Sequence, residues 1–196
     1  MGAKPYQIIR TKFKNLNITP DNLVLEIGSE YGEGSTRFFY CWSYIQNIPF
    51  ITVDVTDFAR NKLQSVGIDC RVAESGSKWC QEELPKLNRK IKVLYLDNFD
   101  WNWFEDKPES PEWITEQIEK YAKRGVVMNN ANSQLEHKLQ LEACLPYMDQ
   151  ESVVIMDDTF MRNGNWSGKG GQCIEVLQQA GYIIEHEGFG AWAYRI

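Results

Sequence analysis

The chain has 196 residues, with 27 acidic side chains against 21 basic ones and a net charge of −6 at neutral pH. A chain of this length with 43% hydrophobic residues can bury one sizeable core, so we expect a single domain over residues 1–196, with residues 1–20 as an N-terminal extension. The acidic balance disfavours a nucleic acid partner, and five scattered cysteines are typical neither of a disulfide framework nor of a zinc site.

The sequence also carries no obvious targeting segment. The first residues, "MGAKPYQIIRTKFKNLNITP", lack the apolar region of a secretion signal, and no stretch approaches the roughly 18 uninterrupted apolar residues of a membrane span. We therefore expect a soluble, cytoplasmic protein with no membrane contact.

Seven short apolar runs predict strands, and the segments between them predict helices. The expected strands are residues 23–27, 50–54, 68–72, 91–96, 152–157, 182–187 and 191–196, and the expected helices are 35–46, 57–64, 78–87, 111–123, 133–147 and 172–179. Alternation of strand and helix favours a parallel sheet covered on both faces, while the short "GFG" link between the last two runs requires antiparallel neighbours. The predicted fold class is α/β, a doubly wound Rossmann-like sheet of seven strands, mostly parallel with an antiparallel C-terminal edge pair.

A glycine-rich loop, "EIGSEYGEGS", follows the first expected strand. The dinucleotide fingerprint has the spacing G-x-G-x-x-G, whereas the spacing from Gly28 is G-x-x-x-G-x-G, which puts Glu30 and Glu33 where the later glycines belong. A pyrophosphate would meet each carboxylate at a cost on the order of 4 kcal/mol. The loop therefore disfavours a nicotinamide dinucleotide and favours a ligand that has positive charge and no phosphate.

The same loop resembles motif I of class I S-adenosylmethionine-dependent methyltransferases, and the resemblance extends from about Asn22 to the C-terminus. It implies that the cofactor is S-adenosyl-L-methionine and that the loop surrounds the methionine part of it. Asp54, 54 − 34 = 20 residues after the last loop glycine, is the residue expected to accept the ribose hydroxyls. The resulting cofactor-binding residues are Glu26, Gly28, Ser29, Gly32, Gly34, Ser35 and Asp54, with Glu74 and Ser75 of "VAESGSKW" near the adenine.

Three carboxylates follow the fourth and fifth expected strands: Asp97 in "YLDNFDW", and Asp157 and Asp158 in "IMDDT". Neighbouring strand ends should bring these side chains together, and their mutual repulsion calls for a proton or a cation. A hard cation with oxygen ligands, Mg²⁺, suits this set. Both segments resemble the catechol-type and the antibiotic-type (cephalosporin and macrolide) O-methyltransferases. The resemblance implies that Asp97, Asp157 and Asp158 ligate Mg²⁺ and that Asp97 and Phe99 lie at the cofactor.

The general base is ambiguous in this sequence. The catechol-type pattern has a lysine at the position of Asp100, and an aspartate is a weaker base unless it is buried. The alternative is His137, in the amphipathic segment "NSQLEHKLQLEACL", which resembles a segment of the antibiotic-type enzymes. Asp100 and His137 are both predicted as candidate catalytic residues. A histidine on such a helix is also compatible with a structural role.

Two further segments could serve the acceptor. Trp101, Trp103 and Phe104 are expected to form an apolar wall, a lid or a dimer contact. The loop "RNGNWSGKGG" is expected to be flexible and either to close over the acceptor or to be a mobile surface loop.

The sequence as a whole predicts metal-assisted O-methylation of a small hydroxylated acceptor. Two alternatives are an N-methyltransferase that acts on a macromolecule and a non-catalytic module that binds S-adenosylmethionine. A nicotinamide-dependent reductase is a third, which Glu30 and Glu33 oppose. The number of chains in the assembly is left open, with a homodimer as one option.

Overall fold

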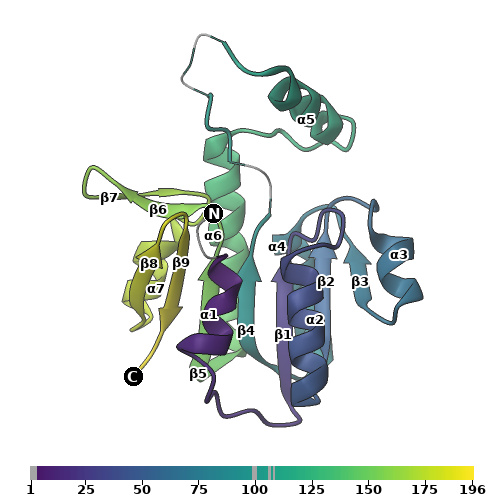
Figure 1. Cartoon of the computed structure of the whole chain (residues 1–196), viewed down its shortest axis with the longest axis vertical. Coiled ribbons are helices and arrows are strands. Elements are labelled where there is room, and N and C mark those ends of the chain that lie inside the picture. The colour runs from purple at the N-terminus through teal and green to yellow at the C-terminus, as the bar shows by residue number, and fades with distance from the viewer. Residues whose placement is uncertain (1–3, 99–100, 106, 108) are drawn as a thin grey trace.

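The protein folds around one seven-stranded sheet, seen in a computed structural model that describes residues 4–98, 101–105, 107 and 109–196. The strand order is β3-β2-β1-β4-β5-β9-β8 (Figure 1). The strands are β1 (Asn22–Ile27), β2 (Phe50–Asp54), β3 (Asp69–Val72), β4 (Lys90–Leu96), β5 (Met148–Met156), β8 (Ile183–Glu187) and β9 (Gly190–Tyr194). β1 to β5 are parallel, and β9 is antiparallel to both β5 and β8, which confirms the predicted fold class.

Helices cover both faces of the sheet (Figure 1). The 3-10 turn η1 (Pro5–Gln7), α1 (Ile8–Thr11), α2 (Ser35–Gln46) and α3 (Arg60–Ser65) lie on one face, and α4 (Gly76–Leu87), α6 (Asn130–Cys144) and α7 (Cys173–Gln179) lie on the other. A second 3-10 turn, η2 (Leu145–Tyr147), leads from α6 into β5. Every residue of β1 is buried, as a strand covered on both faces requires.

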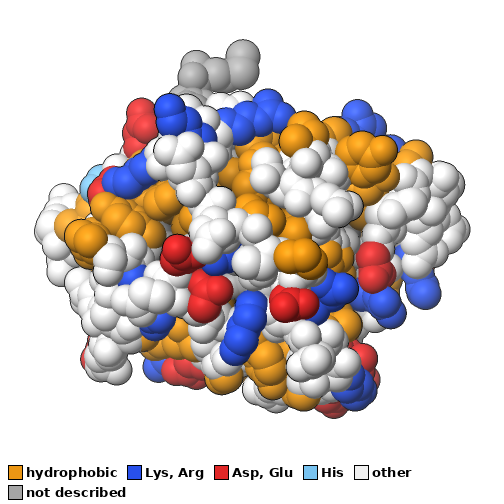
Figure 2. Space-filling view, turned by 90° about the horizontal axis from the view of Figure 1, so that it is seen from below, with side chains coloured by type: hydrophobic (Ala, Val, Ile, Leu, Met, Phe, Trp, Pro, Cys, Tyr) orange, Lys and Arg blue, Asp and Glu red, His pale blue; other side chains and the backbone are white. Residues whose placement is uncertain are grey.

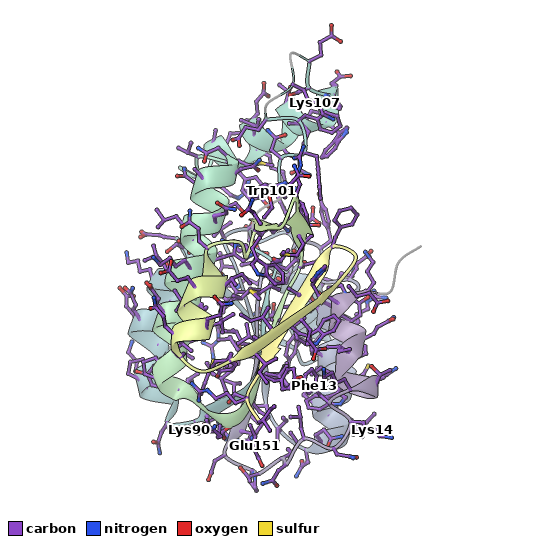
Figure 3. The ribbon with its side chains drawn as sticks, turned by 90° about the vertical axis from the view of Figure 1, so that its left-hand side faces the viewer. Phe13, Lys14, Lys90, Trp101, Lys107 and Glu151 are labelled. Atoms are coloured by element: carbon purple, nitrogen blue, oxygen red, sulfur yellow. The ribbon has the colours of Figure 1, made fainter. Side chains whose placement is uncertain are left out.

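The segment between β4 and α6 projects beyond the carboxyl end of the sheet and carries α5 (Glu112–Ala122) (Figure 1). Figure 3 shows Lys90 at one end of the molecule, Trp101 near the other, and Lys107 farther out. The backbone N–H of Asn102 donates to Oδ1 of Asn130 at 2.8 Å, and Nδ2 of Asn130 donates to the carbonyl of Asn102 at 2.9 Å. This pair ties the projecting segment to the start of α6.

The glycine-rich segment after β5 is a hairpin instead of the flexible loop expected from its composition. Its strands are β6 (Thr159–Arg162) and β7 (Asn165–Gly168), which pair antiparallel. The connecting residues Asn163 and Gly164 both have positive φ, +52° and +78°. This is the conformation of a two-residue type I′ turn, for which Asn-Gly is the preferred sequence. The glycine-rich composition therefore predicted a flexible loop wrongly, whereas the Asn-Gly pair is typical of the hairpin turn that is observed.

The first residues of the described chain belong to the core. Ile9 is fully buried and Phe13 is 9% exposed. The ring of Tyr6 lies 5.0 Å from that of Phe38 and 6.1 Å from that of Tyr95 in β4. The segment that we expected to be a mere extension therefore packs over the sheet beside the carboxyl ends of its strands.

The surface at the amino ends of the parallel strands is mixed in character. Figure 2 shows this face, on which Lys and Arg side chains are interspersed with Asp, Glu and apolar ones. None of the helices in the described part of the chain is both long and apolar enough to cross a membrane.

Candidate functional site

A cavity of about 280 Å³ opens at the carboxyl ends of β1, β2, β4 and β5. Strand order reverses between β1 and β4, and this is where open α/β sheets bind their ligands. The walls also include the N-terminal segment and the end of α5. The lining residues are Lys4, Tyr6, Gly28, Ser29, Glu30, Tyr31, Glu33, Gly34, Ser35, Asp54, Val55, Tyr95, Asp97, Asn98, Tyr121 and Asp157. Among them five are carboxylates and one, Lys4, is basic, so the lining itself is acidic; Glu30, Glu33 and Asp97 also pair with lysines from outside it.

The glycines of the first loop have different tasks. Gly28 has a φ of +101°, and a Cβ there would lie 2.3 Å from the carbonyl oxygen of Asp97. Only glycine allows the loop to lie this close to the end of β4. Gly34, with a φ of +56°, lines the cavity at the start of α2. Gly32 faces the side chain of Leu63 and is absent from the cavity wall, so its cofactor contact stays a prediction.

Asp54, at the end of β2, organises the glycine loop. Its Oδ2 accepts the backbone N–H groups of Ser29 and Glu30, both at 2.8 Å. Its Oδ1 accepts the N–H and the hydroxyl of Thr56 at 2.7 and 2.8 Å. A carboxylate offers about four acceptor sites, so these donors fill them. A contact with ribose hydroxyls would have to replace one of these bonds, and it stays a prediction.

Glu26 lies beneath the loop and is fully buried. The hydroxyl of Thr52 donates to its Oε2 at 2.7 Å. Burial raises the pKa of Glu26 to about 7, because the charged form loses its hydration. Glu26 is not part of the cavity wall, although it directly precedes the loop that is.

The two residues predicted to lie near the adenine, Glu74 and Ser75, are not part of the cavity wall, so their contact with the cofactor stays a prediction. Glu74 is exposed, pairs with Lys78 and faces a separate groove at the β3 edge. The Oγ of Ser75 caps α4 by accepting the N–H of Lys78 at 3.1 Å. Neither residue lines the cavity, where Val55 and Tyr121 are the apolar neighbours that an adenine ring would meet. Phe99, predicted to lie at the cofactor, and Asp100, a candidate base, fall outside the described residues.

The three predicted carboxylates do converge, and a lysine lies among them. The ammonium of Lys169, which follows the hairpin, is 2.7 Å from Oδ1 of Asp97 and 3.2 Å from Oδ2 of Asp158. The hydroxyl of Tyr95 donates to Oδ2 of Asp157 at 3.0 Å. The cation required by this cluster is therefore supplied by the chain itself. We refer to Tyr95, Asp97, Asp157, Asp158 and Lys169 as the carboxylate cluster.

The electrostatics of the carboxylate cluster reflect crowding of like charges. Burial raises the pKa of Asp97; the Lys169 ammonium opposes this rise, and the carboxylates of Asp157 and Asp158 add to it. Burial and the neighbouring Asp97 and Asp157 also raise the pKa of Tyr95 well above its usual value. Its phenol therefore stays protonated and acts as a hydrogen-bond donor.

The cluster does not fit the Mg²⁺ that the sequence predicted. Mg²⁺ requires oxygen ligands at about 2.0–2.1 Å, and the Lys169 ammonium holds the space between Asp97 and Asp158 that such an ion would need. Across the described residues, no group of three or more His, Cys, Asp or Glu side chains is arranged to hold a metal ion.

His137 is fully buried in α6, where its Nδ1 lies 2.8 Å from the carbonyl of Ser133. Burial, reinforced by the charge of Lys169, lowers the pKa of His137 to about 3, so the imidazole is neutral at physiological pH. His137 does not line the cavity. Its role as a base stays a prediction.

Aromatic rings gather beside the carboxylate cluster. Trp103 stacks on Phe160 with ring centroids 5.1 Å apart, and Phe189 meets both rings edge-on at 5.0 and 5.4 Å. Trp103 is 38% exposed and Phe189 is 59% exposed. Of the aromatics that the sequence singled out, Trp103 joins this wall, while Phe104 packs against Trp113 of α5.

Several residues of the site were missed by the sequence analysis. Tyr95 precedes Asp97 by two positions, and residues two apart in a strand share a face, so this signal was available. The Asn-Gly turn could have placed Lys169 at the end of a returning strand. Lys4 and Tyr6 carried no comparable signal, because nothing local links the N-terminal segment to the glycine loop.

Comparison with solved structures identifies the architecture. CalS11, a TDP-rhamnose 3′-O-methyltransferase of calicheamicin biosynthesis, superposes with a TM-score of 0.60 at 13% identity, covering 96% of this chain and 78% of that one. MycE, a methyltransferase of the mycinamycin pathway seen with Mg, S-adenosylhomocysteine and mycinamycin VI, gives 0.57 at 10% identity, covering 97% and 47%. The CurJ carbon methyltransferase gives 0.52 at 12% identity, covering 96% and 52%.

At these identities the likeness shows the fold alone, which this chain shares with these methyltransferase structures. The chain spans about half the length of the MycE and CurJ structures. No family model matches the sequence. No curated protein matches it either.

Proposed function

Because the chain has the class I methyltransferase fold, we propose that it transfers a methyl group from S-adenosyl-L-methionine to an oxygen of a small hydroxylated acceptor. The observation that carries this proposal is the cavity at the switch point of the sheet, where five carboxylates line the wall. A cofactor with a sulfonium and an ammonium suits that lining, whereas a pyrophosphate is repelled by Glu30 and Glu33.

The cofactor's parts match different walls of the cavity. Its ammonium and sulfonium would lie among the carboxylates between the glycine loop and β4. Its own carboxylate would meet Lys4, the basic residue of the lining. The adenosine would extend toward Val55 and Tyr121.

The acceptor would lie between the cofactor and the aromatic wall of Trp103, Phe160 and Phe189. This wall suits the flat face of a ring, and Phe160 follows Asp158 by two positions, which brings the wall next to the carboxylate cluster.

In the reaction, the acceptor oxygen forms a bond to the methyl carbon as the carbon–sulfur bond breaks, which leaves S-adenosylhomocysteine. The hydroxyl proton passes to a base, for which Asp100 and His137 stay predictions. Alignment supplies most of the acceleration, and no step is assigned to a metal.

The identity of the methylated atom is the finer part of the proposal. The CurJ neighbour is a carbon methyltransferase, so the shared fold is compatible with acceptors other than oxygen. The overall acidic charge disfavours a nucleic acid as acceptor. A homodimer and a cytoplasmic location stay predictions as well.

Calorimetry with S-adenosylhomocysteine, followed by turnover with a panel of small phenols and sugars, tests the proposal. We expect micromolar binding of S-adenosylhomocysteine, weaker binding of NADH by at least about a hundredfold, and a methyl group on oxygen in the product by NMR. No heat with S-adenosylhomocysteine would refute the cofactor, and binding without turnover on any acceptor would favour a sensing module.

The aromatic wall offers a matched pair of variants. Trp103→Ala should raise the acceptor KM several-fold with little change in cofactor affinity. Trp113→Ala, which removes another exposed tryptophan that packs on Phe104, should leave the acceptor KM unchanged. Equal effects of the two variants would remove the wall from the proposal.

A further inference from the structure

Lys169 is built into the carboxylate cluster by the backbone around it. Its side chain is 3% exposed, and its N–H donates to the carbonyl of Asp158 at 2.9 Å. The preceding residue, Gly168, has a φ of +83°, and a Cβ there would lie 1.8 Å from that carbonyl oxygen. The following N–H, of Gly170, donates to Oγ1 of Thr159 at 2.9 Å. The returning hairpin thus fixes Lys169 against the end of β5.

Charge balance accounts for a buried ammonium at this position. A lysine taken out of water is unfavourable unless it is paired, and carboxylates crowded at two strand ends are unfavourable without a cation. Contacts with Asp97 and Asp158 at 2.7 and 3.2 Å meet both requirements. A divalent ion bound to the same two oxygens would need the space that Nζ occupies, so the ammonium and the ion exclude each other.

We propose that the ammonium of Lys169 takes the place of a divalent cation in the carboxylate cluster and makes the site independent of metal. Lys169 is a positioning residue: it holds Asp97 and Asp158 at the edge of the cavity, with Asp97 itself part of the wall. The claim that the site excludes metal stands on this geometry alone. The claim that methyl transfer proceeds without metal rests on the proposed function.

Mn²⁺ is the probe that tests the metal-excluding geometry, because its binding is read directly by electron paramagnetic resonance and by calorimetry. We expect wild-type protein to bind Mn²⁺ no more tightly than about 1 mM. Lys169→Ala opens the cluster and should bind Mn²⁺ at least tenfold more tightly than wild type. Asp97→Asn added to Lys169→Ala should abolish that gain.

Two control variants separate charge from position. Lys86→Ala removes an exposed lysine paired with Glu83 and should behave as wild type. Lys169→Arg keeps the positive charge and should keep Mn²⁺ out as wild type does. Circular dichroism and the melting temperature identify any variant that has not folded, and the wild-type measurement stays decisive in that case.

Three results would overturn the inference: micromolar Mn²⁺ binding by wild-type protein, a Lys169→Ala variant that folds but gains no affinity, or a folded Lys169→Arg variant that binds Mn²⁺ like Lys169→Ala.

Cofactor binding is measured separately with S-adenosylhomocysteine. A protein that excludes Mn²⁺ but binds no S-adenosylhomocysteine refutes the proposed function and leaves the role of Lys169 intact. Once an acceptor is known, turnover in EDTA should equal turnover in Mg²⁺, and a loss of more than about tenfold in EDTA would contradict metal independence.

Discussion

Gly28 packs so closely against Asp97 that a Cβ on Gly28 would lie 2.3 Å from the Asp97 carbonyl oxygen. The contact joins the loop after β1 to the end of β4, the two strands between which strand order reverses. One wall of the cavity therefore depends on the absence of a single methyl group.

Gly28→Ala should destabilise the fold and weaken S-adenosylhomocysteine binding. The positive φ costs about 1–2 kcal/mol for any L-residue, and the backbone overlap adds to it, so we expect a total above about 3 kcal/mol. Gly164→Ala is the matched control, because it has a φ of +78° and no heavy atom within 4 Å of the added Cβ. Urea denaturation should show a loss of only about 1–2 kcal/mol for Gly164→Ala, which is the cost of the positive φ alone. Similar losses in the two variants would show that the contact with Asp97 is unimportant.

Asp54→Asn should weaken S-adenosylhomocysteine binding at least about tenfold, since an amide N–H₂ would face backbone donors in place of an acceptor oxygen. The 2′-deoxy form of the ligand distinguishes loop ordering from ribose contact. If Asp54 acts through the loop, calorimetry will show the same loss of affinity for both ligands. A loss confined to the ligand with the 2′-hydroxyl would instead establish the ribose contact. Asp57→Asn, on an exposed carboxylate paired with Arg124, should leave both affinities unchanged.

Lys4→Ala should weaken S-adenosylhomocysteine about threefold to fivefold, because the pair with the ligand carboxylate is partly solvated. The affinity for 5′-methylthioadenosine, which lacks that carboxylate, should not change. Lys14, an exposed lysine at the far end of the molecule in Figure 3, provides the control variant Lys14→Ala. If calorimetry shows that Lys4→Ala weakens both ligands equally, Lys4 acts by packing and not by charge.

Glu26 should make the protein less stable as the pH rises. The folded state keeps the Glu26 proton up to a pKa of about 7, whereas the unfolded chain releases it near the ordinary value of 4.5. The folded state thus binds more protons between these values, and its stability falls as pH rises through them. Between pH 4.5 and 8, Glu26 should lower the free energy of unfolding of the wild-type protein by an amount on the order of 3 kcal/mol. The Glu26→Gln variant should not show this decrease.

Urea denaturation of wild type and Glu26→Gln across this pH range measures the difference directly, because other groups cancel in the comparison. The variant should gain stability relative to wild type as pH rises. Glu74→Gln serves as the control, since the Lys78 ammonium lowers the pKa of the exposed Glu74 carboxyl and reverses the sign. A stability difference between Glu26→Gln and wild type that stays constant with pH would contradict the buried, protonated carboxyl.

The sequence by itself determined the sheet, its helical cover and the meeting of Asp97 with Asp157 and Asp158. These features depend on local patterns: apolar runs define β2 at Phe50–Asp54 as expected, and parallel strand ends must share an edge. The glycine spacing that disfavours a dinucleotide is equally local.

Only the tertiary structure decided what surrounds those residues. The Lys169 ammonium reaches Asp97 across 72 positions through a hairpin, and Lys4 joins a wall made by residues far along the chain. Asp54 turned out to accept bonds from the loop, and Glu74 to face another groove, because both depend on how separate segments pack. Side-chain environments are set by contacts between distant segments, which no local pattern encodes. For this reason the sequence predicted a cation among Asp97, Asp157 and Asp158, but it did not predict that the Lys169 ammonium would be that cation.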